Sequence, residues 1–62
     1  MEKIRVLLVD DHAVVRQGYR RLIESQDGID VVGEAGDAAS AYQSYKNLTP
    51  DVTIVDISMP GR

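Results

Sequence analysis

Apolar residues along the chain fall into blocks with two different periods. Nearly continuous or β-branched blocks predict strands over residues 4–9, 29–35 and 52–57. Between them, apolar residues recur at helical spacing, which predicts amphipathic helices over roughly 12–25 and 38–48. The predicted order is therefore strand, helix, strand, helix, strand.

Strands that alternate with helices predict a parallel sheet with right-handed crossovers. The block 4–9 is almost wholly apolar, as expected of a strand buried on both faces. The block 29–35 carries Asp30 and Glu34, which favours a sheet edge. The third strand should then lie on the other side of the first. The sequence thus predicts a three-layer α/β fold with sheet order 2-1-3 and one helix on each face.

Composition narrows the chemistry that this fold can support. The 62 residues contain no cysteine and a single histidine, His12, so a disulfide or a thiolate zinc site is excluded. A net charge of -3 with scattered basic residues disfavours direct binding of this segment to nucleic acid. The longest apolar run, 6–9, is far too short to span a membrane, and no signal-peptide pattern follows Met1. We therefore expect a cytoplasmic location.

Three acidic residues follow the strands that should be neighbours in the sheet. Asp10 and Asp11 come directly after the first strand, and Asp56 lies near the end of the third. Ligands of open α/β sheets bind beyond the carboxyl ends of such strands, at the switch point of the topology. Converging carboxylates repel each other unless a cation offsets their charge, and oxygen ligands favour Mg²⁺. A carboxylate at such a site can also accept a phosphoryl group.

Structural explanations exist for each of these acids taken singly. Asp10 or Asp11 could cap the first helix, and Asp56 could simply end a strand. The joint placement of a pair after one strand and a single acid after its neighbour favours the site. Asp51 begins the third strand, about 16 Å from Asp56 at 3.3 Å per residue, and is assigned to solvent.

Two longer motifs carry a family resemblance. They are Val6-Leu7-Leu8-Val9-Asp10-Asp11-His12 and Val52-Thr53-Ile54-Val55-Asp56-Ile57-Ser58-Met59-Pro60-Gly61. Together they resemble the first half of a response-regulator receiver domain from two-component signalling, which has a flavodoxin-like fold. The Asp-Asp-His start, the stretch 28–35 and the Met-Pro-Gly ending resemble the subfamily with a LuxR-type helix-turn-helix output domain.

The resemblance implies specific roles at the matching positions. It makes Asp56 the phosphoacceptor, with a sensor histidine kinase as the phosphoryl donor. It makes Asp11, Asp56 and the Ser58 backbone carbonyl direct Mg²⁺ ligands, and gives Asp10 a contact mainly through water. It also implies that the parent protein is a transcription regulator and that the chain itself is not an enzyme.

The same resemblance covers only part of the family's domain. The switch Ser or Thr after the fourth strand and the Lys after the fifth have no counterpart, so residues 1–62 are expected to form a partial receiver domain. The DNA-binding output domain has no counterpart either. We also expect the open edge of the strand 52–57 to pair with a second copy, giving a homo-oligomer.

Three functions follow from these observations. The leading one is a phosphoryl-accepting receiver module. The alternative is a non-catalytic fragment that folds only by association and is not efficiently phosphorylated. A Mg²⁺-dependent phosphohydrolase ranks last, because its nucleophile usually lies in an Asp-x-Asp motif and Asp56-Ile57-Ser58 does not match it.

Several other residues receive structural interpretations. Three tyrosines at apolar helix positions are predicted to pack in the core: Tyr19, Tyr42 and Tyr45. Three arginines of the first helix are predicted to form a solvated face: Arg16, Arg20 and Arg21. The glycines of segment 33–36 are assigned to a turn, and His12 to a structural place at a helix start.

Overall fold

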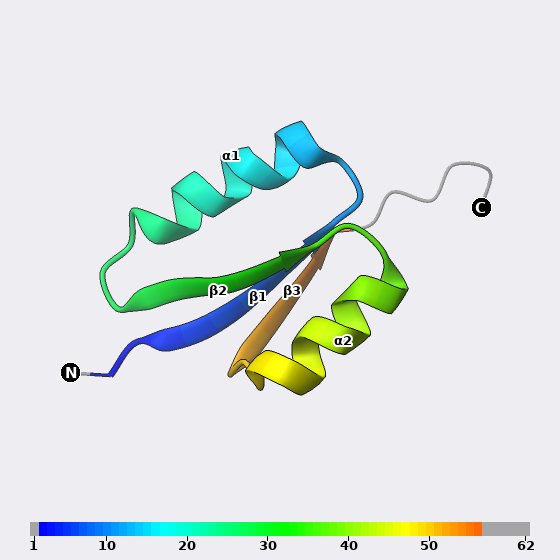
Figure 1. The fold of residues 1–62 in the computed structure, drawn as a ribbon. Helices are drawn as coiled ribbons and strands as arrows, with labels where there is room; N and C mark the ends of the chain where they lie inside the picture. The colour runs from blue at the N-terminus through cyan, green and yellow to red at the C-terminus, as the bar shows by residue number, and fades with distance from the viewer. Residues whose placement is uncertain (1, 57–62) are drawn as a thin grey trace.

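A computed structural model describes residues 2–56, and its elements follow one another in the predicted order (Figure 1). They are β1 (Ile4–Asp10), α1 (Ala13–Glu24), β2 (Ile29–Ala35), α2 (Ala38–Leu48) and β3 (Val52–Asp56). The predicted strands and helices are therefore confirmed. Ile57, which the sequence assigned to the last strand, lies outside the described residues.

The three strands form one parallel sheet with β1 in the middle, in the order β2-β1-β3. Figure 1 shows α1 and α2 on opposite sides of this sheet, so the three-layer arrangement is confirmed. The pairing of β1 with β2 is irregular at one point. Val6 pairs with Val31 but Leu7 pairs with Gly33, so Val32 is an extra residue, a β-bulge.

The core is built on β1, whose residues 6–9 are all buried. Leu7 and Val9 form a buried cluster with Ala35 of β2, and Ala41 of α2 packs against it. Successive side chains of a strand point to opposite faces, so Val6 and Leu8 face α1 instead. This explains why residues 6–9 of β1 are all apolar.

Gly33 lies inside β2, where the sequence analysis had assigned it to a turn. A Cβ built at this position would lie 2.5 Å from Leu48 Cδ1 of α2 and 3.4 Å from Leu7 Cδ1. The first distance is too short for two carbon atoms. The assignment to a turn was therefore wrong: the missing side chain lets α2 approach the sheet closely.

The ends of α2 are fixed by local hydrogen bonds. Asp37 caps the helix, its Oδ1 accepting from the Ser40 backbone N–H at 2.7 Å. Thr49 ends it in a left-handed conformation with φ 44°. The following Pro50 disfavours a right-handed helical conformation at Thr49 and so helps to end the helix there.

Arg5 of β1 holds the connection between α2 and β3. Its side chain donates to the Thr49 carbonyl at 2.9 Å, and its backbone N–H donates to the Asp51 carboxylate at 2.9 Å. The assignment of Asp51 to solvent was therefore incomplete, because this exposed carboxylate is also a hydrogen-bond acceptor for β1. The contact aligns the start of β3 with β1.

Much apolar surface outside β1 remains accessible. All five residues of β3 are exposed, and neither helix has a buried residue. Tyr19, Tyr42 and Tyr45 are among the exposed residues, so the prediction that these tyrosines pack in the core was wrong.

Within residues 2–56, neither helix has the length and apolar character needed to cross a bilayer.

Candidate functional site

The last residues of β1 and β3 lie side by side. Asp10 and Asp56 are Cα partners in the parallel pairing of these strands, and such partners point to the same face of a sheet. That face is the one covered by α1. The predicted juxtaposition of the two acids follows from the strand order and is present in the structure.

Asp10 is a buried carboxylate with one oxygen in use. Its side chain is 1% exposed, and Oδ1 accepts from the His12 backbone N–H at 2.9 Å. Within residues 2–56, Oδ2 is the buried side-chain oxygen or nitrogen that has no hydrogen-bond partner. Burying a charged oxygen without a partner is costly, so this atom favours an added donor or cation.

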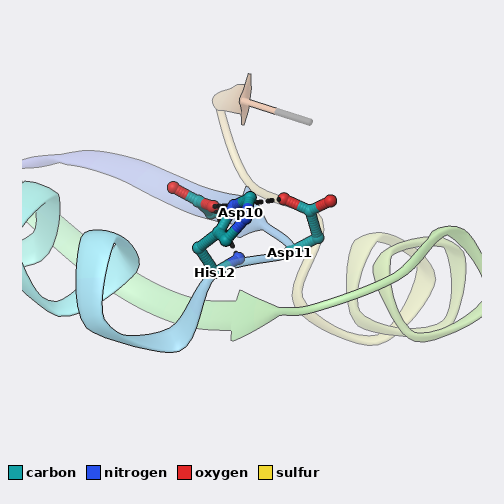
Figure 2. A group of neighbouring side chains, drawn as sticks. All are labelled: Asp10, Asp11 and His12. Atoms are coloured by element: carbon teal, nitrogen blue, oxygen red, sulfur yellow. Dashed lines mark hydrogen bonds and ion pairs between the residues drawn. The ribbon is translucent and has the colours of Figure 1, made fainter. Parts of the chain in front are cut away.

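Asp11 and His12 complete a compact group with Asp10, shown in Figure 2. His12 Nδ1 lies 2.9 Å from Asp11 Oδ1 and 3.9 Å from Asp10 Oδ1. One donor atom from each of the three residues lies within 4.8 Å of the others, so the group could hold a metal ion. The sequence analysis gave His12 only a structural place. The sequence feature that could have indicated a role for His12 in the site is its position directly after an acidic pair.

Asp56 is exposed and stands outside that group of three. The charge of Asp56 acts on Tyr19 of α1. Hydrogen bonding to the Asp56 carboxylate, together with the charges of Asp56 and Asp10 and slight burial, raises the pKa of the Tyr19 hydroxyl. The titration of Tyr19 is therefore linked to the acidic residues of the site, although the sequence analysis assigned this tyrosine to packing. Ser58, the remaining predicted ligand, lies outside the described residues.

Two arginines of α1 converge on Glu34 of β2. Arg16 Nε donates to Glu34 Oε1 at 2.9 Å, and Arg20 Nη1 donates to Glu34 Oε2. Arg20 Nε also reaches Glu24 Oε2 at 3.3 Å. Because Arg16 and Arg20 are both engaged and only partly accessible, the prediction of a solvated face was wrong for them. Arg21 is exposed, as predicted.

This cluster predicts a pH dependence of stability. The Arg20 guanidinium, supported by Arg16, lowers the pKa of Glu34 from its usual value of 4.5, although burial opposes the shift. The folded-state pKa lies below the unfolded one, so the pair stabilises the fold at pH above about 4.5 and the benefit is lost as pH falls through the folded pKa. We expect the thermal midpoint to fall over this acid range, and to fall less in Glu34→Gln.

Glu2→Gln serves as a matched control, because Glu2 is exposed near the N-terminus. The thermal midpoint of Glu2→Gln should fall with pH as steeply as that of the unchanged protein. An equal acid slope for Glu34→Gln and the unchanged protein would contradict a role for the pair.

The acidic residues lie at the carboxyl ends of two adjacent strands of a parallel α/β sheet, where the ligands of such sheets bind. The family profile described as "Response regulator receiver domain" matches residues 6–62. The chain therefore belongs to the response regulator receiver domain family, and the predicted resemblance is confirmed. Receiver domains are signalling domains of two-component systems.

Curated relatives match across nearly the whole chain. "Response regulator GacA" of Pseudomonas viridiflava is 45% identical over 58 residues, which are 94% of this chain and 27% of that protein. "Protein-glutamate methylesterase/protein-glutamine glutaminase" of Hydrogenovibrio crunogenus is 47% identical over 60 residues, which are 97% of this chain and 16% of that protein. The chain thus spans about a quarter or less of the length of these relatives.

Solved structures agree with this assignment. The signal receiver domain of NarL from Mycobacterium tuberculosis superposes with a TM-score of 0.88 at 43% identity, over 98% of this chain and 49% of that one. A LuxR-family response regulator from Aurantimonas sp. SI85-9A1 gives a TM-score of 0.86 at 52% identity, over 97% of this chain and 43% of that one. The relatives include transcription regulators of the LuxR type.

Proposed function

We propose that this chain accepts a phosphoryl group on Asp56 as the receiver module of a response regulator. The observation that carries the proposal is the pairing of Asp10 with Asp56 at the ends of adjacent parallel strands, beside Asp11. Family membership supports it, because the match to the receiver domain profile covers these residues. Asp56 is also exposed, so a donor can reach its carboxylate.

The reaction is a transfer to a carboxylate oxygen. An oxygen of Asp56 attacks the phosphorus of a phosphohistidine on a sensor kinase. An O–P bond forms as the N–P bond breaks, and the imidazole leaves with the bonding electrons and takes up a proton.

The acidic residues fit Mg²⁺. The unpartnered, buried Asp10 Oδ2 and the neighbouring Asp11 carboxylate are the hard oxygen ligands that this ion prefers. We assign Asp11, Asp56 and the Ser58 backbone carbonyl as direct ligands, and Asp10 as a contact made mainly through water. When bound, the ion would offset negative charge on the transferring oxygens.

Magnesium titration tests this site. We expect the chain to bind Mg²⁺ weakly by isothermal titration calorimetry, and Asp11→Asn to show no measurable binding, because a neutral amide replaces an anionic ligand. Asp30→Asn is the matched control, since Asp30 pairs with Arg5 at the opposite end of the sheet. Equal binding by Asp11→Asn and the unchanged chain would remove the carboxylate site.

The parent protein is proposed to be a cytoplasmic transcription regulator, by analogy with the LuxR-family regulator from Aurantimonas. The methylesterase relative shows that a similar receiver segment also occurs in a protein with a different activity. The competing function, a fragment that folds only by association and is poorly phosphorylated, is favoured by the wide exposure of β3.

We further propose that the chain self-associates through the edge of β3 that does not face β1. Val52, Ile54 and Val55 are exposed on this strand, and no described residue pairs with its far edge. Unpaired edges of this kind template pairing with another chain. Light scattering at micromolar concentration should therefore report a dimer or larger species.

Val55→Lys provides the matched variant, because Val55 is 59% exposed and an edge lysine opposes strand pairing. It should shift the population toward monomer. A folded monomer with a cooperative unfolding transition in the unchanged chain would contradict self-association.

A further inference from the structure

Arg16 connects the acidic site to two neighbouring elements. From α1, its Nη1 donates to the Asp10 backbone carbonyl at 2.7 Å and lies 3.5 Å from the Ala35 carbonyl. We propose that Arg16 is a positioning residue that holds the end of β1 in the geometry required for Mg²⁺ binding. This inference rests on the proposed function, because it concerns the same acidic site.

The guanidinium of Arg16 is held from two sides. Glu34 accepts from its Nε at 2.9 Å, and the Arg16 and Glu34 side chains are only 21% and 23% exposed. Arg20 binds the second oxygen of Glu34, so the carboxylate is itself fixed. With Nε occupied by Glu34, Nη1 is directed at the ends of β1 and β2.

Gly36 leaves room for this arrangement. A Cβ built at Gly36 would lie 3.0 Å from Arg16 Nη1 and 3.9 Å from the Asp10 carbonyl oxygen. A side chain here would press on a guanidinium that has little freedom to yield, since both Nε and Nη1 are engaged. Gly36 therefore serves the contact between Arg16 and Asp10, which the assignment of this glycine to a turn did not foresee.

The carbonyl that Arg16 holds belongs to the peptide joining Asp10 to Asp11. Fixing this peptide plane sets the direction in which the Asp11 side chain leaves the backbone. It also places the next N–H, that of His12, where it donates to Asp10 Oδ1 at 2.9 Å. One contact from Arg16 thus constrains two of the three carboxylates assigned to the ion, those of Asp10 and Asp11.

A lysine could not replace this function. Arginine presents several N–H donors in a rigid fork, so one side chain can bind a carboxylate and a carbonyl together. Lysine carries its donors on a single nitrogen at the end of a flexible chain. Arg16→Lys would retain the positive charge and bind either Glu34 or the Asp10 carbonyl.

The test compares Arg16→Met with Arg20→Met. Both variants remove an arginine that binds Glu34, but within the described residues Arg20 makes no hydrogen bond to a backbone carbonyl of β1 or β2. A role in stability alone predicts similar effects for both variants. A positioning role predicts an effect at the site for Arg16→Met only.

Two readouts decide the outcome. In protein without metal, we expect amide hydrogen exchange at His12 to be severalfold faster in Arg16→Met and unchanged in Arg20→Met. In Mg²⁺ titrations, we expect Arg16→Met to bind about tenfold more weakly, as for other residues that orient metal ligands, and Arg20→Met to bind like the unchanged chain. Equal exchange and equal affinity in the two variants would overturn the proposal.

The exchange readout separates this inference from the metal site itself. If the unchanged chain binds no Mg²⁺, the proposed metal site fails, whereas His12 exchange still shows whether Arg16 holds the end of β1. If Arg16→Met does not fold, Arg16→Lys replaces it. An Arg16→Lys protein with unchanged exchange and unchanged affinity would overturn the proposal as well.

Discussion

The Asp56→Asn variant is expected to incorporate no phosphoryl group from a small donor such as acetyl phosphate, under conditions in which the unchanged chain becomes phosphorylated. An amide lacks the anionic oxygen that attacks phosphorus.

Intact-mass spectrometry provides the measurement: the unchanged chain should gain the mass of one phosphoryl group, and Asp56→Asn should not. Asp51→Asn is the matched control, because its amide oxygen can still accept from Arg5 and it lies at the opposite end of β3. It should be phosphorylated like the unchanged chain. Phosphorylation of Asp56→Asn at the usual rate would show that another residue is the acceptor.

The Leu7→Ala variant is expected to lose a large part of its stability and to unfold at a much lower temperature than the unchanged chain. Leu7 is 0% exposed and belongs to the buried cluster under α2. Removing such a side chain costs about 2 to 5 kcal/mol. The whole stability of a chain of 62 residues is only roughly 3 to 9 kcal/mol. A single cavity can therefore remove most of it.

Circular dichroism during heating provides the measurement. Leu22→Ala makes the same chemical change at a position that is 63% exposed, and it should shift stability by no more than about 0.5 kcal/mol. If Leu7→Ala melted at the same temperature as Leu22→Ala, β1 would not be the centre of the core.

The fold was predictable from the sequence because its strongest signals are local. The apolar block of β1, the charges on β2 and the helical spacing of α1 and α2 are properties of short segments. Together with the handedness of parallel crossovers they determine the sheet order. The adjacency of Asp10 and Asp56 then follows from topology alone.

The side-chain contacts around the site depend on tertiary geometry that periodicity does not encode. Arg16 and Arg20 occupy polar helix positions, and a polar position next to a neighbouring strand has the same sequence pattern as one in solvent. Asp51 is a polar residue just before a strand, a position that is usually solvated. Its carboxylate lies beside the Arg5 N–H only because β3 pairs with β1. The tyrosines were misassigned for the opposite reason, since apolar spacing does not show whether a covering element is present.

The bulge at Val32 changes the face of the sheet toward which the later residues of β2 point. Val31 pairs with Val6 and Glu34 pairs with Leu8, so these two β2 residues face α1 although they are three positions apart. In an uninterrupted strand, an odd spacing would place them on opposite faces. If Val32 instead paired in register with Leu7, Glu34 would lie opposite Val9 and point toward α2, away from both arginines. The bulge at position 32, more than the side chain there, therefore decides which helix receives the negative charge of β2.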